Sequence, residues 1–155
     1  MYNTHMNKNL VLVGGICLVK ENRNKLYWFL VDTSSEEENE FWEIPKNTVR
    51  KVESSVKSVI RMMGEQGGMS IRILEEAGRS GGVTMVSGKT IPQRIIYYVG
   101  IVQSAEGEPI GFPNYAWVEH SKAVKKLGKR EQAILKAAKK EYKKWVKQKA
   151  NQPSE

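Results

Sequence analysis

The segment Asn47–Met69, NTVRKVESSVKSVIRMMGEQGGM, decides which fold this chain adopts. Its pattern predicts a loop followed by one helix, because serines precede the apolar repeat as helix caps and a Gly-Gly pair ends it. Val56, Ile60 and Met63 recur at spacings of four and three, which predicts one buried helix face. Gly64 lies inside this pattern and weakens the last turn by about 1 kcal/mol relative to alanine.

Strand patterns lie on both sides of this helix. We expect strands at LVLVGGICLV, LYWFLVD, MSIRILEEAG, GVTMVSG and QRIIYYVGIV, with FWEIPKN as a short extended piece. The first two, joined by a turn at KENRNK, should form a hairpin, and the glycine of the first strand should be closely packed. YAWVEHSKAVKKLG should begin a short helix, and an amphipathic helix should run from about Lys129 to Lys149.

The length and composition set limits on the class of protein. A chain of 155 residues fits one domain, spanning 1–155, with a core that needs no disulfide or structural metal. Cys17 is the single cysteine, and no cysteine and histidine cluster is present. The apolar run near residue 10 is too short to span a membrane and lacks a small-x-small cleavage site. We therefore expect a cytoplasmic protein that does not bind membranes.

The positive charge is concentrated in the tail. The net charge is +8, but the segment from Lys122 to Lys149 holds twelve Lys or Arg against two Glu, which leaves the rest of the chain at −2. Such a helix could contact RNA phosphates without sequence preference. Lysine outnumbers arginine eleven to one there, and no aromatic residue interleaves on the basic side. A solvated helix face is therefore the favoured interpretation, with RNA as the alternative partner.

Charged residues and glycines recur at fixed spacing in 47–69. Glu53 is followed by Arg61 eight residues later, then by Glu65 and Gly68, with methionines at the apolar positions. This order resembles the Nudix box: Gly, five residues, Glu, seven residues, then Arg-Glu-apolar-any-Glu-Glu-any-Gly-apolar. The flanks are also similar to that family, with a glycine-bearing first strand and a Trp-x-x-Pro-Lys lead-in from Trp42. The likeness extends over residues from about 10 to 140.

Three positions depart from the box. Asn47 stands in place of the loop glycine, and we expect it to keep the loop shape because asparagine tolerates positive φ. Met62 replaces the first glutamate of the metal cluster, and Gln66 replaces the last. Methionine offers Mg²⁺ no ligand and glutamine offers one neutral oxygen, so the metal site should be severely weakened.

The resemblance implies a fold and a set of roles. The fold is an α/β/α sandwich around a mixed sheet. Glu53 and Arg61 would brace the box together with Asn47 and Gly68. Glu65 would be the remaining ligand of Mg²⁺, or of Mn²⁺, and a catalytic residue, with Gln66 auxiliary. Lys46 would contact phosphate, with a solvated surface lysine as the alternative, and Trp42 would stack on a base, with a place in the core as the alternative.

The implied function has two forms. The first is a weakened Mg²⁺-dependent pyrophosphohydrolase of nucleoside diphosphate derivatives, such as dinucleoside polyphosphates. The second is a non-catalytic module that binds a nucleotide or RNA. Six glutamates are candidates for completing the metal site: Glu43, Glu75, Glu76, Glu106, Glu108 and Glu119. Tyr97 and Tyr98 are neighbours on a strand, so at least one of them should be in the core.

Overall fold

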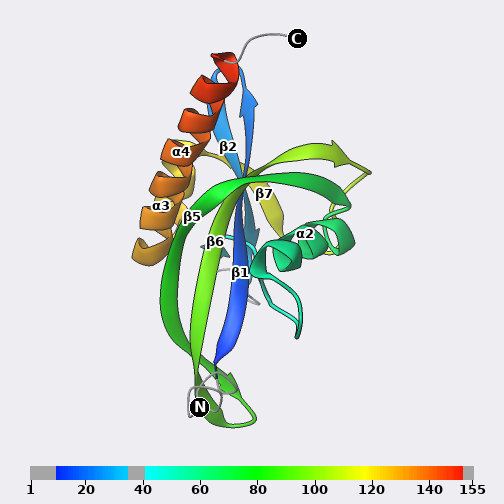
Figure 1. Ribbon diagram of the computed structural model, residues 1–155, viewed down its shortest axis with the longest axis vertical. Coiled ribbons are helices and arrows are strands. Elements are labelled where there is room, and N and C mark those ends of the chain that lie inside the picture. Colours follow the sequence, from blue (N-terminus) through cyan, green and yellow to red (C-terminus); the bar gives the residue numbers. More distant parts are fainter. Residues whose placement is uncertain (1–9, 35–40, 152–155) are drawn as a thin grey trace.

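A strongly twisted sheet with helices on both faces forms the body of the protein (Figure 1). The computed structural model describes residues 10–34 and 41–151. The strands are β1 (Val11–Asn22), β2 (Lys25–Asp32), β3 (Trp42–Glu43), β4 (Lys46–Thr48), β5 (Met69–Val86), β6 (Lys89–Ala105) and β7 (Tyr115–Glu119). The helices are α2 (Ser55–Glu65), α3 (His120–Lys126) and α4 (Lys129–Ala150). Among these described helices, none combines the length and apolarity that a membrane crossing requires.

The sheet is mixed, as predicted. Its strand order is β3-β2-β1-β6-β5, while β4 pairs with β1 and β7 pairs with β2. β1 runs parallel to β6, and the other pairs are antiparallel. The predicted β1–β2 hairpin is confirmed: Arg23 (φ 52°) and Asn24 (φ 66°) both have positive φ, as a two-residue primed turn requires.

Two apolar layers cover the two faces of the sheet. Trp28, Tyr97 and Leu135 belong to the layer beneath α3 and α4, and Phe29 and Tyr98 belong to the layer beneath α2. Neighbouring strand residues point to opposite faces, so both tyrosines are buried, each in its own layer. The predicted α/β/α sandwich is confirmed.

The box helix α2 packs closely on the first strand. A Cβ atom placed on Gly14 would lie 2.5 Å from Ser58 Oγ and 2.9 Å from Val59 Cγ1. Only glycine allows this approach, which confirms the expected close-packed glycine in the first strand. The helix therefore has a fixed position relative to the centre of the sheet.

The buried face of α2 differs from the predicted one. The buried apolar residues are Val59, Met62 and Met63, whereas the side chain of Ile60 is 41% exposed. The contact with β1 at Gly14 turns Val59 toward the sheet. Met62 lies one turn further along the same face, which brings it into the core.

One strand prediction and one helix prediction were wrong in extent. The two strands expected at residues 69–78 and 82–88 form the single strand β5, which pairs with β6 along its whole length with three shifts of register. Long-range pairing here outweighs the local glycines. YAWVE forms strand β7 against β2 instead of beginning a helix, and α3 starts only at His120.

Candidate functional site

The loop before α2 is tied to the helix by an ion pair. Arg61 Nε donates to Glu53 Oε2 at 2.8 Å, and Arg61 Nη2 donates to Glu53 Oε1 at 3.0 Å. The backbone N–H of Arg50 also donates to Glu53, at 3.0 Å. The hydrogen bonds from Arg61, and then from Arg50, lower the pKa of Glu53 to about 2. Ser54 caps the helix by accepting from Lys57 N at 3.1 Å.

Asn47 holds the loop in a way that the sequence did not predict. It lies in β4 opposite Gly14, and positive φ among the described non-glycine residues occurs only at Arg23, Asn24, Val52 and Ser87. Asn47 therefore does not use the positive φ that asparagine tolerates. Its side-chain Nδ2 donates to Ser58 O at 3.0 Å, which links β4 to α2.

The three metal-cluster positions of the box lie in three different environments. Met62 is 1% exposed and packs in the layer beneath α2. The Glu65 side chain is 53% exposed and has Arg50 Nη2 4.0 Å from its Oε1. Gln66 lines a cavity of about 430 Å³. The structure therefore does not bring Met62, Glu65 and Gln66 together in one described cavity.

We call this cavity the box cavity. It lies between the end of β2, the β3–β4 lead-in and residues 111–114, and its lining includes Asp32, Glu43, Lys46, Gln66, Phe112 and Asn114. Gly111 is closely packed there, since its N–H donates to Gln66 O at 2.8 Å and a Cβ atom would lie 2.5 Å from Gln66 Cα. The end of the box helix thus forms part of the cavity wall.

Lys46 lines the box cavity, but carboxylates already surround its ammonium group. Its Nζ donates to Glu131 Oε2 at 2.6 Å and to Ile44 O at 2.8 Å, and lies 3.2 Å from Glu43 Oε1. A phosphate reaching Lys46 would therefore compete with two carboxylates. The sequence placed Lys46 beside the box correctly, but gave no sign of these partners.

Glu131 is the residue of this site that sequence reasoning missed. It lies in the first turn of α4, and besides Lys46 it accepts from Ile44 N at 2.9 Å and from Tyr97 OH at 2.6 Å. Burial, and then the nearby Glu131 carboxylate, raise the pKa of Tyr97 well above its usual range. The only signal in the sequence was an acidic residue at a helix start, which is common for other reasons.

Asp32 and Trp42 are partners in the β2–β3 pairing, but only Asp32 lines the box cavity. Asp32 accepts from the backbone N–H of Ser34 at 2.9 Å and of Phe41 at 3.0 Å, which lowers its pKa and keeps it charged in the box cavity. Trp42 packs against the layer beneath α3 and α4, with Lys126 Nζ 5.5 Å from its ring centroid. It is not among the residues lining the box cavity.

The donor set does not fit a divalent cation. Among the described residues, no three His, Cys, Asp or Glu side chains gather as a metal cluster. Glu65 supplies one carboxylate, but the neighbouring Arg50 guanidinium would repel a second cation there. Of the six candidate glutamates, Glu43 pairs with Lys46, Glu76 with Arg79, and Glu108 accepts from Tyr115, so a cation at any of these three would compete with that partner.

Comparison with known proteins gives similarity in structure only. No family model matches the sequence, and no curated protein matches it. An Ap4A hydrolase from C. elegans in a binary complex is 18% identical, with a TM-score of 0.62 over 82% of this chain and 93% of that one. The Nudix domain of NrtR from Shewanella oneidensis, complexed with ADP-ribose, is 16% identical, with a TM-score of 0.59 over 84% and 87%. A MutT protein from Methanosarcina mazei is 17% identical, with a TM-score of 0.61 over 86% and 96%.

Proposed function

We propose that this chain, which has the Nudix fold, binds a nucleoside diphosphate derivative in the box cavity and has weak or no metal-dependent hydrolysis. The observation that carries the proposal is the divergence of the three metal-cluster positions, of which only Gln66 lines the cavity. A structural neighbour complexed with ADP-ribose and another described as an Ap4A hydrolase support this class of ligand.

The lining of the box cavity suits the nucleoside part of such a ligand. A volume of about 430 Å³ is within the usual range for small-molecule sites. Asp32 and Glu43 can accept hydrogen bonds from ribose hydroxyls or base amines, and Phe112 offers an aromatic ring. Both carboxylates would repel phosphate, so the phosphates should lie away from them, on the side of the cavity lined by Gln66 at the end of α2.

A side-chain cation is available for the phosphates at that end. The Arg50 side chain is 65% exposed and lies beside Glu65, the residue next to Gln66. Its guanidinium can bind phosphate oxygens in bidentate fashion. We infer that Arg50 supplies part of the positive charge that a metal ion supplies in a typical box.

Binding measurements with matched variants test this proposal. ADP-ribose and Ap4A are titrated calorimetrically into the wild type, Arg50→Ala and Lys51→Ala. Lys51 is the adjacent exposed cation in the same loop. Loss of one charged hydrogen-bonding partner should raise the Kd about tenfold in Arg50→Ala, while Lys51→Ala stays within about twofold. An equal rise in Kd in both variants would mean that Arg50 acts only through the general positive charge of the loop. If neither ligand binds the wild type, the proposal is refuted.

Slow hydrolysis is the second candidate, because Glu65 keeps a solvent-accessible carboxylate and Glu53 pairs with Arg61. Phosphate release from a panel of nucleoside diphosphate derivatives with Mg²⁺ or Mn²⁺ tests it. Turnover that disappears in Glu65→Gln would establish an enzyme, and silence across the panel would leave the binding function. The RNA alternative is supported by the charge of the tail alone.

A further inference from the structure

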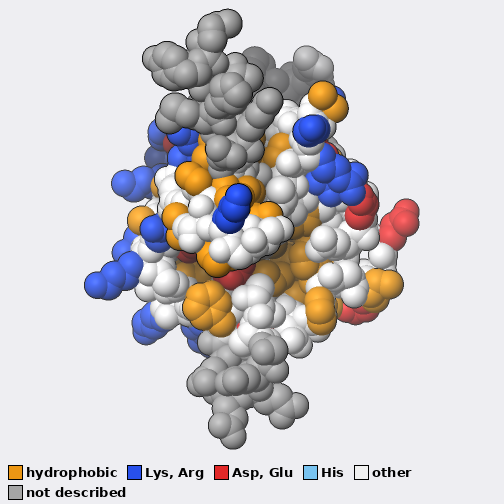
Figure 2. Space-filling model, turned by 90° about the horizontal axis from the view of Figure 1, so that it is seen from below, with side chains coloured by type: hydrophobic (Ala, Val, Ile, Leu, Met, Phe, Trp, Pro, Cys, Tyr) orange, Lys and Arg blue, Asp and Glu red, His pale blue; other side chains and the backbone are white. Residues whose placement is uncertain are grey.

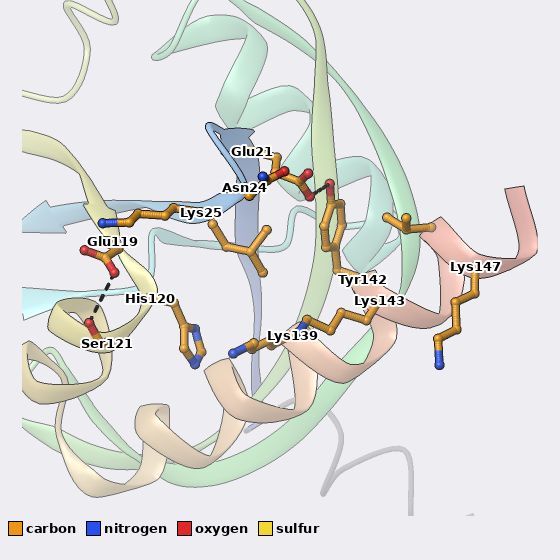
Figure 3. A pocket seen from close by; sticks show the side chains of 12 residues that line it. Glu21, Asn24, Lys25, Glu119, His120, Ser121, Lys139, Tyr142, Lys143 and Lys147 are labelled. Atoms are coloured by element: carbon orange, nitrogen blue, oxygen red, sulfur yellow. Dashed lines mark hydrogen bonds between the residues drawn. The ribbon is translucent and has the colours of Figure 1, made fainter. Parts of the chain in front are cut away.

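A second cavity lies on the opposite face of the sheet from the box helix. It has a volume of about 480 Å³ and lies between the β1–β2 turn, the start of α3 and the helix α4 (Figure 3). We call it the tail cavity, and its lining includes Glu21, Glu119, His120, Lys139, Tyr142 and Lys143. It shares no lining residue with the box cavity, so a ligand bound here would not depend on the proposed function of that cavity.

Two lysines of α4 place unneutralised charge in the tail cavity. Lys139 and Lys143 are one helical turn apart, and in Figure 3 both side chains extend from α4 toward His120. Within the part of the chain that the structure describes, neither has a carboxylate within ion-pair distance. In Figure 2, Lys and Arg side chains project along the left edge, the side on which α3 and α4 lie in Figure 1. Like charges at this spacing repel, and an anion would relieve that repulsion.

His120 adds an oriented donor. Trp28 Nε1 donates to His120 Nδ1 at 2.9 Å, so the neutral ring carries its hydrogen on Nε2. Burial, and then Lys139, Lys143 and Lys136, lower the pKa of His120, against the opposite effect of Glu119. An anion bound beside these lysines would offset their effect and raise that pKa.

The strand side of the tail cavity holds two carboxylates and one lysine, Lys25. Glu21 of β1 accepts from Tyr142 OH at 3.2 Å, and Glu119 of β7 accepts from Ser121 at 3.5 Å. Each carboxylate has further capacity to accept hydrogen bonds from hydroxyl groups. A long polyanion would meet these two carboxylates, so the arrangement favours a small ligand that is anionic at one end and carries hydroxyls at the other.

We propose that the tail cavity is a second ligand site, which binds a small phosphorylated polyol with its phosphate at Lys139, Lys143 and His120 and its hydroxyls at Glu21 and Glu119. Lysine is a common phosphate ligand as a point charge, and the volume accommodates a sugar phosphate. The ring of Tyr142 lines the tail cavity between Glu21 and Lys143 (Figure 3).

NMR titration of the full chain with ribose 5-phosphate tests this site. The chain has only two histidines, so the His120 ring signals are assigned by their loss in His120→Gln. Saturable shifts of these signals and a raised pKa of His120 are expected with ribose 5-phosphate, weaker binding with inorganic phosphate, and none with ribose. The double variant Lys139→Gln/Lys143→Gln should raise the Kd at least about tenfold.

The matched control is Lys140→Gln/Lys144→Gln, which removes the same charge from α4 at positions outside the tail cavity. It should change the Kd by less than about twofold. Equal losses in the two double variants would mean that the helix acts as a diffuse charge, which overturns the proposal. Unmoved His120 signals at millimolar ribose 5-phosphate would also overturn it, as would tighter binding of a short RNA that displaces the sugar phosphate.

Discussion

At the scale of single residues, folding lowers the pKa of Glu53 in the box loop. Glu53 stays ionised to a much lower pH in the folded protein than its ordinary pKa of 4.5 would give, because Arg61 and the backbone N–H of Arg50 donate hydrogen bonds to the carboxylate. The lowered pKa means that this contribution to stability is complete above the unfolded value. It is lost as pH falls toward the folded value of about 2.

We therefore expect the stability advantage of the wild type over Glu53→Gln to shrink as the pH falls from about 4.5 to about 2. The free energy of unfolding of both proteins is measured by denaturant titration across this range. Asp32, whose pKa is also lowered, titrates in both proteins and cancels in the difference. A difference that stays constant over the window would show that the ion pair does not stabilise the loop.

For individual box residues, the sequence predicted the position in the motif but not the orientation of the side chain. Spacing alone identified Met62 and Gln66 as the altered positions and Glu53 and Arg61 as a pair. It did not predict that Met62 would be buried, because the apolar repeat of α2 was compatible with a face through Ile60. The contact of α2 with Gly14 brings Val59 and Met62, and not Ile60, toward the sheet.

Among the secondary-structure elements, α2 contains a correctable weakness. A Cβ atom on Gly64 would meet no atom within 4 Å, and its φ is not in the left-handed region. Gly64→Ala should therefore raise the free energy of unfolding by about 0.5–1 kcal/mol, through helix propensity and a less flexible unfolded chain. Thermal unfolding followed by circular dichroism measures the change.

The control for this substitution lies three residues further on. A Cβ atom on Gly67 would lie 2.8 Å from Met63 O and 2.9 Å from Met69 Cε, so Gly67→Ala should destabilise the protein. If Gly64→Ala also lowered the melting temperature, the helix would not extend through this position as the structure has it.

Element boundaries followed local signals where those signals were strong. A turn within KENRNK and a serine cap for α2 were predicted from the sequence, and the last helix begins and ends close to its predicted bounds. The full extent of β5 was not predicted, because its pairing with β6 outweighs the glycines within it. β7 was not predicted, because its pairing with β2 outweighs the helical pattern that follows it. Such pairing is set by the whole sheet.

Across the molecule, Glu131 joins α4 to the box lead-in. Its partners Lys46 and Tyr97 are 85 and 34 residues away in sequence, which is why no local pattern could predict the contact. Its side chain is 12% exposed, so the hydrogen bonds are largely shielded from water. The family resemblance therefore predicted the fold, but not the network that occupies the expected phosphate lysine.

Glu131→Ala should lower the free energy of unfolding by about 2–3 kcal/mol, because it leaves Ile44 N and Tyr97 OH without Glu131 as acceptor and leaves Lys46 with one carboxylate, Glu43. Glu141→Ala is the matched control on the same helix, since its pair with Lys144 is exposed and should contribute less than about 0.5 kcal/mol. Denaturant titration compares them, and equal effects would contradict a structural role for the Glu131 network.

Metal-independent binding is the property that would set this protein apart from a typical Nudix box, which depends on a cation. Calorimetric titration of ADP-ribose, with Mg²⁺ and again with excess EDTA, is the decisive experiment for the box cavity. We predict the same Kd under both conditions, within about twofold, because side chains and not a cation bind the phosphates. Binding that is detectable only with Mg²⁺ would refute this prediction and the proposed function with it.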